Sequence, residues 1–234
     1  MKILAPQISP RRAAGFTMME IAICLAIIGF ALVAIIGVLP IGLDTQRDNR
    51  EETVIGQDAT VLLDAIRSGA RGADYLTNYV YAITNTGVNA TWSGYDSAKL
   101  TTGARIVGLL STPEFENNYN ISNHIVAYVR SISGLAAEKP PQNNSIMLDD
   151  AFTYRVLVVN APPSAAPGAA SAYDQQLAAN QHELRLTFLW PQLPNGNVGG
   201  GRQTFRATVA GQLTQTSTNP PLYFYQSQTF NSAP

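Results

Sequence analysis

The residue with the clearest potential chemistry is Glu20, a lone acid at the front of a long apolar run. From Ile21 to Leu43 there are 23 residues without a formal charge. A helix of that length would measure about 34 Å, enough to cross the hydrocarbon core of a bilayer. A carboxylate deep in such a helix costs on the order of 2.5–3.5 kcal/mol, and less near the interface. The chemistry indicated at this position is therefore charge pairing.

An amine that could pair with Glu20 would arise from cleavage of the chain between Gly15 and Phe16. Glu20 would then be the fifth residue, about one helical turn from the new α-ammonium group. The carboxylate of one chain and the ammonium of its neighbour, at the same depth of parallel helices, would neutralise each other. This arrangement favours assembly over an isolated helix.

The residues around this position resemble a known signal. A short basic leader ending in RRAAG, then FTMME and an apolar helix, is similar to the N-terminal signal of type IV pilins and type II secretion pseudopilins. The resemblance implies that a prepilin peptidase cuts after Gly15, that the new N-terminal Phe16 is methylated, and that Glu20 docks the subunit into a helical filament. Pro40 departs from the pattern, because many pilins carry this proline nearer the middle of the helix.

A second resemblance covers more of the chain. The run FALVAIIGVLPIGLDTQRDNREET, together with IVGLLSTPEF and AYVRSISGLAAEK, is similar to the pseudopilin-like group called Verru_Chthon cassette protein B. This group adds little about mechanism.

The charges that flank the apolar run predict its orientation in a membrane. Lys2, Arg11 and Arg12 precede the run with no acid among them, whereas the charges of residues 44–52 sum to net negative. By the positive-inside rule, the N-terminus lies in the cytoplasm and the chain after Asp44 lies outside it, which the resemblance to pseudopilins identifies as the periplasm. We expect a single-pass protein of the inner membrane. Cys24, the only cysteine, lies inside the run, which excludes an intrachain disulfide.

Beyond the apolar run, the apolar residues of 54–73 recur at spacings of three and four, as in a helix with one buried side. We predict one helix from Phe16 to about Leu76, bent near Pro40. The predicted divisions are a leader (1–15), a transmembrane helix (16–43), an amphipathic continuation (44–81) and a β-rich periplasmic domain (82–234).

Three later runs alternate with the period of a strand. They cover residues 152–160, 182–190 and 202–211, and a further strand is expected near residues 124–133. We read residues 161–181 as an insertion and 191–201 as a glycine-rich hairpin loop. A sheet laid against the one-sided helix predicts an α+β, pilin-like fold.

No set of residues predicts an active site. His124 and His182 are far apart in sequence and are expected at the surface or at a strand end, and the glycines of 199–201 lack the lysine of a phosphate loop. The two asparagines and two aspartates at 143–144 and 149–150 could offer oxygens to calcium, but hydrated turns are the better interpretation. We expect no enzyme activity, no cofactor, no metal and no small-molecule substrate. With a net charge of -1 and no basic block, nucleic acid is not an expected partner.

Two functions remain open at this point. The first is a structural subunit, a pseudopilin or minor pilin, whose partners are the prepilin peptidase, other pilins and membrane lipid. The second is an envelope binding or sensor domain on an uncleaved signal anchor, with no role in a filament. A membrane-tethered hydrolase has no residues to support it.

Overall fold

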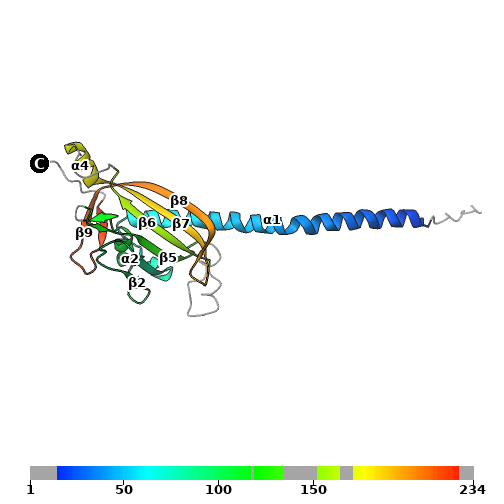
Figure 1. The fold of residues 1–234 in the computed structure, drawn as a ribbon, viewed down its shortest axis with the longest axis horizontal. Coiled ribbons are helices and arrows are strands. Elements are labelled where there is room, and N and C mark those ends of the chain that lie inside the picture. Colours follow the sequence, from blue (N-terminus) through cyan, green and yellow to red (C-terminus); the bar gives the residue numbers. More distant parts are fainter. Residues whose placement is uncertain (1–14, 117–118, 134–151, 164–170, 227–234) are drawn as a thin grey trace, which may run out of the picture. The chain divides into compact units, whose positions relative to one another are not determined.

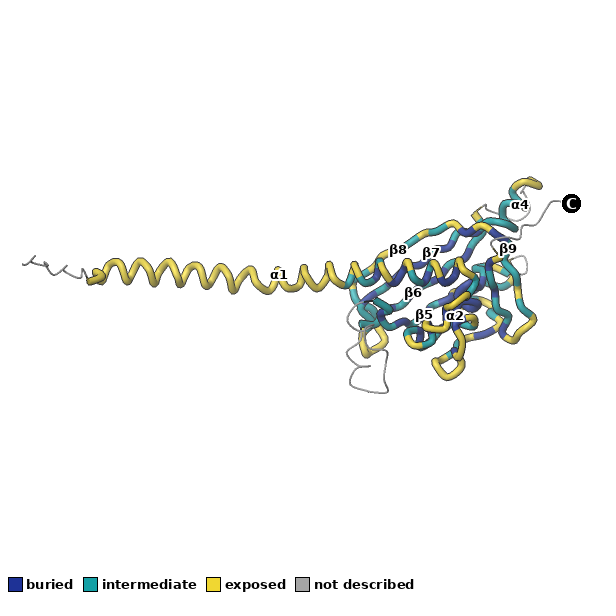
Figure 2. The backbone as a smooth tube through the Cα atoms, turned by 180° about the vertical axis from the view of Figure 1, so that it is seen from behind, coloured by how far each residue is buried: buried dark blue, intermediate teal, exposed yellow. Residues whose placement is uncertain are grey.

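A single helix, α1 (Met18–Arg67), forms the N-terminal part of the computed structural model, which describes residues 15–116, 119–133, 152–163 and 171–226. The chain divides into two units, residues 1–51 and 52–234. In the first unit every described residue up to Arg50 is exposed (Figure 2). α1 is the one described helix that is long and apolar enough to cross a membrane, and it continues through Pro40.

In the second unit, the part of α1 after Glu52 has one buried side. Its buried positions follow the predicted spacing of three and four residues, and they are Ile55, Asp58, Ala59, Leu62, Ala65 and Ile66. The prediction of an amphipathic second half is therefore confirmed up to this point. Asp58 is the one charged residue on that side.

The helix ends earlier than expected, at Arg67. The N–H of Gly69 donates to the Ile66 carbonyl, and the N–H of Ala70 donates to the Ala65 carbonyl. This pair of bonds is a Schellman motif, which requires the left-handed φ of +66° that Gly69 adopts. The predicted helical continuation over 68–81 is wrong, because this cap turns the chain into a short 3-10 helix, η1 (Asp74–Asn78), and then into a strand.

The strands form one six-stranded antiparallel sheet in the order β2-β1-β5-β6-β7-β8 (Figure 1). Their bounds are β1 Val80–Asn85, β2 Gly94–Asp96, β5 Ile125–Arg130, β6 Thr153–Ala161, β7 Gln181–Gln192 and β8 Val198–Ala210. Two small hairpins complete the described strands, β3 (Phe115–Glu116) with β4 (Ile121–Ser122) and β9 (Gln212–Gln215) with β10 (Tyr223–Gln226). The predicted strands at 152–160, 182–190 and 202–211, and the one near 124–133, are confirmed, and so is the α+β arrangement.

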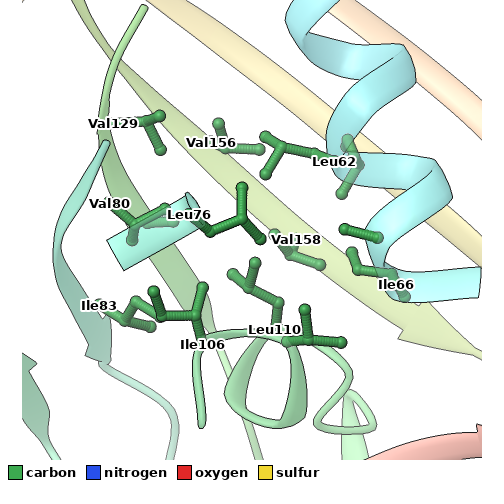
Figure 3. Packing of buried hydrophobic residues seen from close by; sticks show 14 of the residues in the cluster. Leu62, Ile66, Leu76, Val80, Ile83, Ile106, Leu110, Val129, Val156 and Val158 are labelled. Atoms are coloured by element: carbon green, nitrogen blue, oxygen red, sulfur yellow. The ribbon is translucent and has the colours of Figure 1, made fainter. Parts of the chain in front are cut away.

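The core lies between the inner face of the sheet, the second half of α1 and the helix α2 (Gly103–Leu110). Figure 3 shows Leu62 and Ile66 of α1 directed toward Val156 and Val158 of β6, with Leu110 of α2 beside them. Each of these side chains is at most 2% exposed. The alternation predicted for residues 184–190 holds, since its even-numbered residues are buried.

Two loop predictions are corrected. Residues 191–201 form little loop, because β7 extends to Gln192 and β8 already begins at Val198. Two of the glycines there allow close packing: a Cβ on Gly199 would lie 2.6 Å from the Pro191 side chain, and a Cβ on Gly201 would lie 2.4 Å from the Trp190 ring. The expected insertion contains a helix, α4 (Ala172–Asn180), which begins with a capping box between Ser171 and Asp174.

A buried carboxylate ties α1 to the sheet. Asp58 accepts hydrogen bonds from the N–H of Ile132 (2.9 Å), the N–H of Ser133 (2.8 Å), the hydroxyl of Ser133 and the hydroxyl of Tyr154 (2.7 Å). Burial raises the pKa of Asp58, and these hydrogen bonds to the ionised form oppose that shift. The helix, the end of β5 and the start of β6 thus meet at one side chain.

Candidate assembly site at the start of the helix

The three residues singled out from the sequence lie within one short stretch at the start of α1. Gly15 and Phe16 precede the helix and have no regular secondary structure, and Phe16 is 84% exposed. A Cβ built on Gly15 would meet no atom within 4 Å. The Gly15–Phe16 bond is therefore accessible and lies outside the helix, as a peptidase substrate must be.

Glu20 forms the first turn of α1 together with Thr17. The N–H of Thr17 donates to Oε2 of Glu20 (2.8 Å), and the N–H of Glu20 is 3.3 Å from Oγ1 of Thr17. The N–H of Ile21 donates to the Thr17 carbonyl, which makes Thr17 the N-cap residue. These contacts are a capping box, in which side chains satisfy two N–H groups that the helix leaves unpaired.

The capping box gives Glu20 a role within its own chain. A carboxylate in the first turn is stabilised by the positive end of the helix dipole. The hydroxyl of Thr17 also contacts Oε2 of Glu20, at 3.0 Å. Oε1 of Glu20 accepts no hydrogen bond from any described residue, so one oxygen stays available. Our sequence interpretation missed Thr17, although the spacing T-x-x-E ahead of an apolar run is a known helix-start signal.

The apolar surface behind this first turn has no cover. All large apolar side chains from Met18 to Leu43 are about half to nine-tenths exposed within the described structure. Cys24 lies on the same stretch and is exposed and free. Such a surface is compatible with a membrane anchor.

The structure does not bring the other candidate residues together. His124 is exposed, ahead of β5, and His182 lies at the start of β7, so each takes one of the two expected positions, at the surface or at a strand end; His182 is buried there. The ring of His182 packs edge-on against Tyr225 at 5.5 Å, and burial lowers its pKa. The described residues contain no group of three or more His, Cys, Asp or Glu side chains that could hold a metal. The asparagines and aspartates of 143–150 lie outside the described residues.

Comparisons with protein families, with characterised proteins and with solved structures find no match for this chain.

Proposed function

We propose that the chain is a structural subunit, a pseudopilin or minor pilin of a type II secretion or type IV pilus-like filament. A prepilin peptidase would cut between Gly15 and Phe16, Phe16 would be methylated, and the trimmed chain would assemble through its N-terminal helix. The chain would enter the inner membrane with its N-terminus inside and its second unit in the periplasm. The observation that carries this proposal is the carboxylate of Glu20, held at the start of an uncovered apolar helix with one oxygen still available.

The capping box explains how an acid can exist at that depth before assembly. In hydrocarbon an unpaired N–H or carboxylate is costly, and here each offsets part of the cost of the other. The remaining charge is not neutralised within the chain. An α-ammonium group from a neighbouring subunit, approaching Oε1 of Glu20, would complete the neutralisation and would favour the filament over the lone helix.

The exposed apolar surface of the first unit supports the same function. Lipid would cover this surface in the membrane, and neighbouring helices would replace the lipid in the filament. Gly29 and Gly37 are small residues at which helices could approach closely, since a Cβ at either would meet nothing within 4 Å. The antiparallel sheet of the second unit, with the end of α1 packed on it, is an α+β arrangement that supports the proposal.

N-terminal mass spectrometry of the membrane-extracted chain tests the proposal. The expected result is a chain that starts at methylated Phe16, in a host that has a prepilin peptidase. A chain that retains Met1 in that host would refute processing, and the uncleaved signal anchor with an envelope binding domain would replace the filament subunit.

A further inference from the structure

The β8 strand forms one edge of the six-stranded sheet, and no described strand pairs with its outer side. β8 is 13 residues long and, in the described part of the chain, pairs only with β7. The opposite edge strand, β2, has three residues. From Gly201 to Ala210 the register with β7 is regular, and there is no proline. A long regular edge presents a row of unpaired N–H and C=O groups that can pair with another strand.

Two side chains of β8 on the outer face of the sheet, the face away from α1, are basic. Arg202 and Arg206 lie on this face, four residues apart, with Thr204 between them, and all three are exposed. Arg202 lies opposite Leu189 and forms no ion pair with a described residue. The open edge therefore carries a guanidinium without a partner.

The second arginine has a like-charged neighbour. Arg206 lies opposite Arg185, and one carboxylate oxygen of Glu183 is shared between them, at 4.0 Å from Arg206 and 3.6 Å from Arg185. Like charges directly opposite each other in a sheet are destabilising. A second acid at this position would relieve that repulsion.

We propose that β8 binds an extended acidic strand of another protein, which adds to the sheet as an antiparallel edge strand. The partner strand would carry acids opposite Arg206 and Arg202, four residues apart, and an apolar residue opposite Phe205 on the inner face. Directly opposite residues in such a pair have Cβ atoms about 5 Å apart, which is within reach of a carboxylate–guanidinium contact. Main-chain hydrogen bonds would supply affinity, and the arginines would set register and specificity.

A second copy of this chain fits the edge poorly. Antiparallel pairing of two β8 strands about Thr204 places Arg202 of each copy opposite Arg206 of the other. Any antiparallel pairing of β8 with itself collects four arginines on one face. The charge pattern therefore selects a different chain, and this holds whether or not the protein assembles into a filament.

Binding of a synthetic peptide to the full-length chain in detergent micelles tests the proposal. The peptide Thr-Val-Glu-Val-Thr-Val-Glu-Thr places its acids four residues apart, and its lysine analogue is the control. At an ionic strength of about 0.15 M, where the Debye length is about 8 Å, we expect the acidic peptide to bind and to slow hydrogen exchange at β8 amides. The double variant R202E/R206E should lose at least about tenfold in affinity for it, because two cross-strand attractions become repulsions. The same variant should bind the lysine peptide with protection of the β8 amides, which also shows that its sheet is folded.

A matched variant, R67E/R71E, makes the same change of charge at two exposed arginines away from the sheet. Its affinity for the acidic peptide should stay within about twofold of wild type, since exposed charges at a distance are screened. The proposal is overturned if the acidic peptide does not bind the wild-type chain, or if R202E/R206E binds it equally well. Binding without protection of β8 amides would also overturn it, because the peptide would then be held by general charge attraction.

Discussion

Replacing Asp58 with Asn should destabilise the second unit by about 2 kcal/mol, because it removes one hydrogen-bond acceptor. Asp58 accepts four hydrogen bonds, two at each carboxylate oxygen. An asparagine keeps one oxygen and replaces the other with an NH2 group. The hydroxyls of Ser133 and Tyr154 can rotate to accept from that group, but the N–H of Ile132 or Ser133 cannot. One buried N–H would be left unpaired, at a cost of about 1–3 kcal/mol.

Thermal unfolding of the full-length chain in detergent, followed by tryptophan fluorescence, measures this loss. Both tryptophans, Trp92 and Trp190, lie in the second unit, so the signal does not report on the first unit. For a domain of this size, 2 kcal/mol lowers Tm by about 4–8 °C. Asp64→Asn is the matched control, because Asp64 is an exposed acid on the same part of α1 and its loss should change the stability by less than about 0.5 kcal/mol. If Asp58→Asn unfolds at the wild-type temperature, the hydrogen bonds at Asp58 do not hold the helix to the sheet.

The free energies of unfolding of wild type and Asp58→Asn, compared as a function of pH, test how burial and hydrogen bonding set the pKa of Asp58. Because burial raises the pKa of Asp58 above the ordinary value of 3.8 for an aspartate, the folded state binds a proton more tightly than the unfolded chain. The stability that comes from this tighter proton binding is fully present below pH 3.8. It is lost as the pH rises through the pKa of Asp58 in the folded state. The free energy of unfolding of wild type, relative to Asp58→Asn, should therefore fall as pH increases through that window. A relative stability that rises with pH would show that the hydrogen bonds outweigh the burial.

Three further outcomes concern the candidate site and the sheet. Replacing Gly15 with Leu should leave the precursor uncut in the membrane, and mass spectrometry that finds normal processing would count against the cleavage site. Glu20→Ala should still be processed but should not co-purify with partner pilins, and wild-type co-purification would remove its docking role. Gly201→Ala should cost about 1–3 kcal/mol because its Cβ would overlap the ring of Trp190, whereas Gly200→Ala, with open space around it, should be neutral or slightly stabilising in the same unfolding assay. Equal effects of the two glycine variants would refute the packing argument.

The features that could be predicted from the residues are those with a short repeat. Apolar residues every three or four positions predicted the buried side of α1, and alternation predicted β6, β7 and β8. The acid near the start of the apolar run likewise singled out Glu20. The N-cap at Thr17 and the end of α1 are equally local features, since T-x-x-E is a start signal and Gly69 is a stop signal.

Other features depend on contacts between distant parts of the chain. Asp58 looks like one more charged residue of a helix, and it is a buried anchor only because Ser133 and Tyr154, 75 or more positions away, bring their donors to it. His182 is buried because β10 places Tyr225 against it.

Local periodicity decided which segments became helix or strand, because it depends on neighbours within a few residues. The sequence also placed Glu20 at the start of the apolar helix, since that position depends only on the residues beside it. Strand order, and with it the open edge at β8, followed from which segments pair after the chain closes long loops. That pairing is a property of the whole second unit, and no short stretch of residues encodes it.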